Sequence, residues 1–188
     1  MTSMTSRRLI QTRRIVCEGY ERSDGLYEVE ATLVDVKPYA VSVGDRALIP
    51  AEEPFHHMRM RIAVDTEFMI HEAVAETVRA PYDACPEICS SYGQLVGLQL
   101  GPGFQKQLRA RLGGNHGCTH LTELLSPVAT TAMQTVWHVR DQLEKPRSER
   151  KFRTGKNGRP AEIDGCHALH VDGEAVRLHY PLFRQEKI

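Results

Sequence analysis

This 188-residue chain lacks the marks of several protein classes. Lys plus Arg and Asp plus Glu number 24 each, so the net charge is zero. A dedicated nucleic-acid binder, which needs a basic surface, is therefore not expected. No apolar run approaches the roughly 18 residues of a membrane span, and residues 1–14 have no apolar stretch typical of a secretory signal. These absences predict a cytoplasmic protein that does not bind membranes.

The chain also lacks a cysteine pattern typical of disulfide-bonded proteins. Its five cysteines are an odd number, widely spread, and none forms a Cys-x₂-Cys pair. In a reducing compartment they are either buried packing residues or ligands and nucleophiles. Four of the nine histidines lie within a few residues of a cysteine, which favours the second interpretation.

Alternating apolar and polar residues predict a small, mostly antiparallel sheet. The expected strands are 15–20, 26–36, 57–64 and 68–78, with turns at Asp24-Gly25 and Asp65-Thr66. Met58, Met60 and Ile62 share the buried face of the third strand. Residues 38–54, with three prolines and a glycine, are expected to form an irregular connection.

After Pro81 the apolar residues recur with a helical period. Short helices are expected at 85–95 and 104–112, followed by a long helix from about residue 121 to 137. Pro127 either kinks this helix or marks its first turn. Asp172-Gly173 predicts a C-terminal β-hairpin with arms 168–171 and 175–180.

The predicted fold is α+β, with helices packed on one face of the sheet and the C-terminal β-hairpin as an extension. The length favours a single domain over residues 1–188, with a flexible segment at 1–14. The basic segment 146–160 has no apolar period. It is either a solvated, mobile linker or a lid for an anionic substrate.

Three element ends bring cysteine and histidine toward one expected pocket. Cys118 precedes the long helix, where the helix dipole favours a thiolate. His56 continues the buried face of the third strand, and thiolates and imidazoles suit zinc or iron. The predicted metal ligands are His56, Cys85, Cys118 and His120. The structural alternative is that the two cysteines only pack in the core.

Two further residues are predicted to move protons. His57 lies on the opposite strand face from His56, beside Arg59 and Arg61. Tyr82 lies on the loop that leads to Cys85. The structural alternatives are a solvated histidine and an ordinary turn residue.

Several segments resemble a bacterial family known only as a domain of unknown function, DUF2889. The likeness reaches from the N-terminal strands to about Trp137. The segments that carry it are Pro81–Cys85, Gly117–Leu121, His56–Met58, Gly19-Tyr20 and Asp24–Leu26. The resemblance implies a role in bacterial breakdown of aromatic or acyl-CoA compounds.

The layout of residues 56–143 is similar to that of IscU/NifU-type iron–sulfur scaffold proteins. Residues 58–65 resemble their paired-strand segment, Ala84-Cys85 their second cysteine and residues 115–121 their last ligand pair. The chain departs from the pattern at the first cysteine, where it has about Pro54, and directly before the last, where it has Gly117. The resemblance implies a shared fold with a site rebuilt for one metal ion.

The leading prediction is a cytoplasmic bacterial enzyme, a lyase or hydrolase, that acts on a small aromatic or acyl metabolite. Zinc or iron is expected to act as a Lewis acid or to hold an activated water. One alternative is a scaffold or carrier for an iron–sulfur cluster. Another is a metal-free lyase that uses the same pocket. The expected partner is a small-molecule substrate, and a homodimer is left open.

Overall fold

The structure, a computed structural model, describes residues 5–142, 159–160 and 162–183, without the side chains of residues 138–142. Contacts divide the chain into two compact units, Met1–Arg140 and Asp141–Ile188, which are described separately. The basic segment 146–160 lies outside the described residues except for Arg159 and Pro160. The single-domain organisation stays a prediction.

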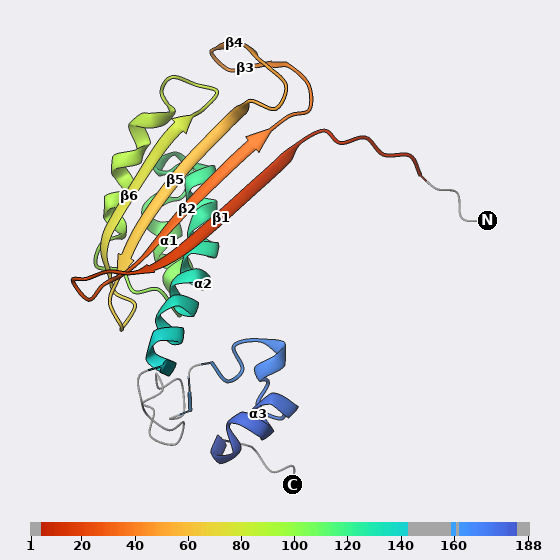
Figure 1. The fold of residues 1–188 in the computed structure, drawn as a ribbon. Coiled ribbons are helices and arrows are strands. Elements are labelled where there is room, and N and C mark those ends of the chain that lie inside the picture. Colours follow the sequence, from red (N-terminus) through yellow and green to blue (C-terminus); the bar gives the residue numbers. More distant parts are fainter. Residues whose placement is uncertain (1–4, 143–158, 161, 184–188) are drawn as a thin grey trace. The chain divides into compact units, whose positions relative to one another are not determined.

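The first unit contains a four-stranded antiparallel sheet (Figure 1). Its order is β1-β2-β5-β6, so consecutive hairpin partners lie next to each other. The α+β class and the antiparallel sheet are confirmed. The strand bounds are β1 Thr12–Glu21, β2 Tyr27–Val36, β5 Pro54–Val64 and β6 Ile70–Arg79. Because β1 begins at Thr12 rather than at residue 15, Arg13 belongs to the sheet.

The connection between β2 and β5 is more regular than expected. It contains a small two-stranded sheet, β3 Val41–Val43 and β4 Arg46–Ile49. Gly44 forms the turn with φ 59°, and a Cβ there would lie 2.4 Å from the carbonyl oxygen of Pro81. The turn therefore requires glycine both for its backbone angle and for its close approach to the loop after β6.

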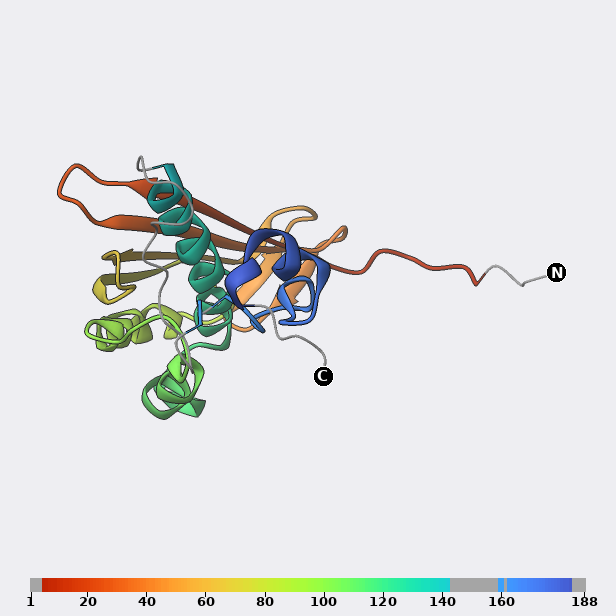
Figure 2. The same ribbon diagram turned by 90° about the horizontal axis from the view of Figure 1, so that it is seen from below.

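The helices of this unit lie on one face of the sheet, as Figures 1 and 2 show. They are the 3₁₀ helix η1 Cys85–Leu95, the helix α1 Phe104–Leu112, the one-turn 3₁₀ helix η2 Gly114–His116 and the long helix α2 Thr119–Gln142. Alternate residues of β2 are buried against them, as are Met58, Met60 and Ile62 of β5. The opposite face carries Arg59 and Arg61 in ion pairs with Glu76, Glu28 and Glu72.

Helix α2 continues through Pro127, so this proline does not mark its first turn. Proline lacks an N–H group, which leaves the carbonyl of Glu123 without its usual helical donor. The helix is held by a buried stripe comprising Leu121, Leu124, Leu125, Val128, Ala132 and Val136. In the described part of the chain, no helix combines the length and hydrophobicity needed to cross a bilayer.

The prediction of a C-terminal β-hairpin is wrong. Residues His167–Leu169 form the 3₁₀ helix η5, Glu174–His179 form the helix α3, and Pro181–Phe183 form the 3₁₀ helix η6. Gly173 has φ −78° rather than the positive φ of a tight hairpin turn, and it precedes α3 as its N-cap. Glu174 and Arg177 pair one turn apart, which favours a helix. A small core of Ile163, Val171 and Val176 holds this second unit together.

A close approach between α2 and β1 gives the first testable prediction. A Cβ at Gly19 would lie 2.0 Å from Oγ1 of Thr135. We expect Gly19→Ala to lower the free energy of unfolding by about 1–3 kcal/mol, because helix and strand must separate. Thr135→Ala in the same chain removes the obstructing oxygen and should restore most of the loss. Urea unfolding followed by circular dichroism measures the effect.

The matched control is Gly93→Ala, since a Cβ there meets no atom within 4 Å. It should change the free energy of unfolding by less than about 0.5 kcal/mol. Equal effects of Gly19→Ala with and without Thr135→Ala would contradict the close contact.

Candidate functional site

A buried carboxylate lies at the end of β2. Asp35 is the one buried charged side chain among the described residues, and its exposed fraction is 0%. Arg13 on β1 binds it with two hydrogen bonds, Nε to Oδ1 and Nη2 to Oδ2, both 2.7 Å long. Such a two-pronged pair is stronger and more directional than a single contact. The guanidinium therefore fixes the position of the carboxylate.

His56 on β5 contacts the same carboxylate from the other side. Its Nδ1 lies 2.9 Å from Oδ2 of Asp35. The register of the sheet places Arg13 and His56 directly opposite Asp35 on the two neighbouring strands. Directly opposed residues on antiparallel strands point to the same face. Strand pairing alone therefore aligns guanidinium, carboxylate and imidazole on the helix side of the sheet.

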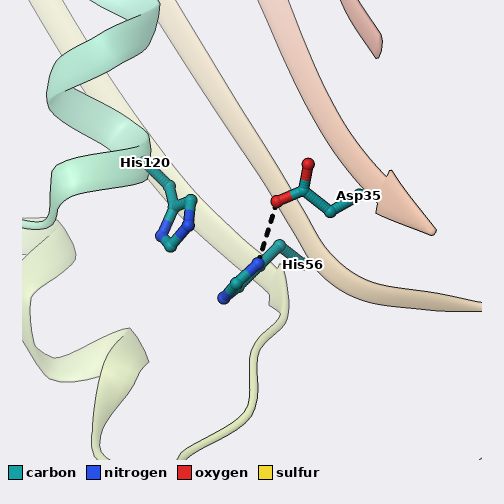
Figure 3. A group of neighbouring side chains, drawn as sticks. All are labelled: Asp35, His56 and His120. Atoms are coloured by element: carbon teal, nitrogen blue, oxygen red, sulfur yellow. Dashed lines mark hydrogen bonds and ion pairs between the residues drawn. The ribbon is translucent and has the colours of Figure 1, made fainter. Parts of the chain in front are cut away.

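Helix α2 adds a second imidazole from its first turn. The ring of His120 lies over that of His56, with 3.8 Å between the ring centroids and 34° between the ring planes. Figure 3 shows the two rings and the carboxylate of Asp35 pointing toward one another from three separate elements. Glu123, one turn further along the helix, forms an ion pair with Nη1 of Arg13. Arg13 therefore joins the helix to the sheet.

The start of α2 is held in place by Tyr92 of η1. This side chain is fully buried, and its hydroxyl oxygen accepts the backbone N–H of Cys118 at 3.0 Å. The same oxygen lies 2.9 Å from the carbonyl of Cys118 and 2.8 Å from Oγ1 of Thr122. Because the hydroxyl bonds to the chain on both sides of His120, it limits the movement of that histidine.

Burial and neighbouring charges set the ionisation of the three side chains. Burial lowers the pKa of His56, and the hydrogen bond to Asp35 only partly opposes this. Burial, together with the charges of His56 and Arg13, also lowers the pKa of His120. Burial opposes ionisation of Asp35, but hydrogen bonds from Arg13 and His56 outweigh it and lower its pKa. The group thus combines a carboxylate with two neutral imidazoles near neutral pH.

Asp35, His56 and His120 also have the donor geometry of a metal site. Each offers one ligand atom, and the three atoms lie within 4.8 Å of one another. Among the described residues, one group of three or more His, Cys, Asp or Glu side chains has its ligand atoms this close together, and it consists of these three residues. A carboxylate and two imidazoles form an accepted donor set for zinc and for non-haem iron.

Of the four ligands predicted from the sequence, the structure brings His56 and His120 together. Cys118 lies beside His120, with its Sγ 3.9 Å from Nδ1 of that histidine. Cys85 begins η1 and packs partly buried against the core, and it is not a member of the group.

The two predicted proton-transfer residues lie elsewhere. His57 is on the open face of the sheet, away from the helices, where burial and the charge of Arg59 lower its pKa. Tyr82 is exposed in the turn before η1. Neither residue contacts Asp35, His56 or His120 in the described hydrogen bonds, and their predicted roles stay predictions.

Three residues of the site were not predicted from the sequence: Arg13, Asp35 and Tyr92. Arg13 fell in a segment expected to be flexible, and Asp35 ended a strand whose other inward positions are apolar. A signal was present, because Asp35 is two residues beyond the buried Leu33 and shares its strand face. A charged side chain at an inward position needs a partner or a function. Nothing in the local pattern marked Tyr92.

Comparison with known proteins identifies the family. The profile described as "Protein of unknown function (DUF2889)" matches residues 11–134. This chain therefore belongs to the DUF2889 family, and the match includes Arg13, Asp35, His56 and His120. No curated protein matches the chain, and no solved structure does. The likeness to IscU/NifU-type scaffold proteins stays a prediction.

The buried ion pair gives the second testable prediction. Asp35→Asn removes the charge but keeps the shape, and it leaves the guanidinium of Arg13 without its buried partner. We expect the free energy of unfolding to fall by about 3 kcal/mol, at the low end for a broken buried pair because the Arg13 side chain is 31% exposed. Urea unfolding at neutral pH measures it.

The control is Glu30→Gln, a change of the same type at an exposed position on the opposite face of β2. It should cost less than about 0.5 kcal/mol. If Asp35→Asn is as stable as this control, the Arg13–Asp35–His56 contact does not stabilise the fold.

Proposed function

We propose that this protein is a metal-dependent enzyme of the lyase or hydrolase class. In this proposal, zinc or iron is held by Asp35, His56 and His120. The observation that carries it is the convergence of one carboxylate and two imidazoles, whose donor atoms lie within 4.8 Å of one another. Structural zinc sites have four protein ligands, whereas catalytic sites keep three and leave a position for water or substrate. Three protein ligands therefore favour catalysis.

The spacing of the first two donors supports this ligand set. Metal–ligand bonds of about 2.1 Å place two donor atoms about 3.0 Å apart at a right angle and about 3.4 Å apart at the tetrahedral angle. Oδ2 of Asp35 and Nδ1 of His56 are 2.9 Å apart. An ion would replace the hydrogen bond between them, so His56 would then carry its proton on Nε2. A ring nitrogen of His120 completes the set.

Arg13 is compatible with a ligating carboxylate. Each carboxylate oxygen has two lone pairs, so Oδ2 can accept a hydrogen bond and bind an ion together. Ligating carboxylates in proteins are commonly hydrogen-bonded by outer residues that fix their orientation. Arg13 has this role in the proposal, with bonds of 2.7 Å to both oxygens. Its ion pair with Glu123 also joins β1 to α2, the helix that supplies His120.

The free-energy cost of burying these charged side chains is a further argument for function. A buried ion pair is often no more stabilising than apolar residues of the same size. Buried groups with shifted pKa values that converge on one point are typical of catalytic sites. The other inward-facing residues of β2 are apolar and fully compatible with a plain core. Asp35 departs from that pattern at the one point where two histidines approach it.

A bound zinc or iron ion supplies Lewis acidity and lowers the pKa of a bound water. The positive charge of Arg13 balances the negative charge of Asp35, and Tyr92 holds the backbone that carries His120. We propose a small aromatic or acyl metabolite as the substrate, in the bacterial cytoplasm. The zero net charge supports a small-molecule partner rather than nucleic acid.

The alternative of an iron–sulfur scaffold has less support. A cluster needs thiolate ligands that converge, and among the described residues Cys85 does not join the group that contains His56 and His120. The metal-free lyase differs from the main proposal only in whether an ion is bound. Metal analysis therefore separates the two.

Metal content tests the ligand set directly. Protein purified without chelator should contain about one zinc or iron ion per chain. His56→Gln and His120→Gln should each lower the metal content at least about tenfold, because each removes one of three ligands. Elemental analysis by mass spectrometry measures it.

Two controls identify which side chains matter. His71→Gln changes a histidine on β6 that bonds to Asp65, outside the group, and should keep its metal. Cys85→Ser should also keep its metal. Loss of metal in Cys85→Ser would instead support the ligand set predicted from the sequence. Wild-type protein that takes up neither zinc nor iron would contradict the metal proposal.

Turnover tests the reaction class. Cinnamoyl-CoA is a suitable probe because it is both aromatic and an acyl thioester. Hydration removes its conjugated double bond, whereas hydrolysis releases a thiol. We expect one of these reactions, abolished by chelator, restored by zinc or iron(II), and reduced at least about a hundredfold by His120→Gln.

His57→Gln is the discriminating variant in this assay, since His57 faces the other side of the sheet. A greater loss of turnover with His57→Gln than with His56→Gln would contradict the proposed metal centre. Turnover unaffected by chelator would favour the metal-free alternative. Failure to turn over aromatic and aliphatic acyl thioesters would contradict the substrate class.

A further inference from the structure

The outer edge of β1 is unusually open for a strand of its length. Among the described residues, strand β1 has a neighbour on one side only, whereas β2 and β5 are paired on both sides (Figure 1). The opposite edge strand, β6, is partly covered, because Ile70 exchanges backbone hydrogen bonds with Gly97 and Leu98. Eight of the ten residues of β1 are exposed. Long open edges are the sites at which sheets pair with another chain.

The side chains of β1 include apolar residues in positions that solvent reaches. Val16 is 55% exposed, Tyr20 43% and Ile15 36%. A β-bulge is one of the features by which natural proteins protect an open edge. The pairing of β1 with β2 is continuous over all ten residues and has no bulge. The strand therefore keeps a regular backbone along its whole open edge.

The charges of β1 are arranged so that the strand complements itself. Arg13 and Arg14 lie in its first half, and Glu18 and Glu21 in its second half. Arg13 is bound to Asp35 on the helix side, but Arg14 and Glu18 form no ion pair with another described residue. If two copies of β1 pair antiparallel with Val16 opposite Val16, each Arg14 lies opposite the other copy's Glu18. A different partner would need an acidic residue opposite Arg14 and a basic residue opposite Glu18.

We infer that the chain forms a homodimer through antiparallel pairing of β1 with β1 of a second copy. The two four-stranded sheets then become one continuous sheet with a two-fold axis at Val16. Val16, Arg14 and Glu18 share the face away from the helices, because they alternate with Arg13 and Cys17 on the helix side. Directly opposed side chains on such strands are in contact. The interface thus contains a central Val–Val contact and two Arg–Glu pairs.

The same charges exclude the competing arrangements. A parallel pairing of β1 in register places Arg14 opposite Arg14 and Glu18 opposite Glu18. Like charges at directly opposed positions are destabilising. A shift of the antiparallel register by one residue separates both Arg–Glu pairs and turns Val16 toward the other face. The charge pattern therefore favours the proposed register over these two arrangements.

A charge-exchange experiment tests the inference. Wild-type protein should be dimeric by analytical ultracentrifugation. Arg14→Glu and Glu18→Arg should each weaken dimerisation about tenfold or more, because two attractive pairs become repulsive. Mixing the two single variants should restore a dimer that contains one chain of each, since both cross-strand pairs are then attractive. Native mass spectrometry identifies that mixed dimer.

The double variant R14E/E18R should dimerise with itself, because it exchanges the two charges within one chain. Arg59→Glu is the matched control, as it reverses an exposed charge on the central strand β5 and should leave the dimer intact. A monomeric wild type, or single variants that remain as dimeric as this control, would overturn the inference. Metal content should be unchanged in Arg14→Glu, so this proposal and the proposed function fail or succeed separately.

Discussion

The carboxylate of Asp35 is the charge around which the rest of the site is organised. It is fully buried between strands, and it is held on one side by Arg13 and on the other by His56. A buried carboxylate without partners would be costly. The guanidinium offsets that cost, and through Glu123 it also connects to helix α2. One side chain therefore determines where the first strand, the third strand of the sheet and the long helix meet.

The precision of the site comes from two different kinds of support. Strand pairing aligns Arg13, Asp35 and His56, because its register fixes which residues lie opposite one another. His120 is positioned instead by the start of α2, which the buried hydroxyl of Tyr92 holds at Cys118. Catalytic groups on rigid elements with such outer support keep their geometry better than groups on loops.

Much of the fold was predictable because it depends on local periodicity. The alternation in β2 and β5 and the apolar stripe of α2 are properties of short windows of sequence. His56 was correctly placed on the inward face of its strand by the same reasoning. The C-terminal hairpin failed because Asp172-Gly173 suits a hairpin turn and a helix start alike. Glu174 and Arg177, which pair across one helical turn, add to the stability of the helix.

The sequence by itself determined the α+β class, the inward faces of β2 and β5 and the two histidines that approach each other. These follow from the alternation of side chains along a strand and from the 3.6-residue period of a helix. Only the tertiary structure decided that Asp35 and Arg13 join those histidines and that Cys85 does not. Strand register and helix placement bring together residues far apart in the chain, and no local pattern encodes which of them meet. The partners of a buried charge are therefore known only once the sheet is assembled.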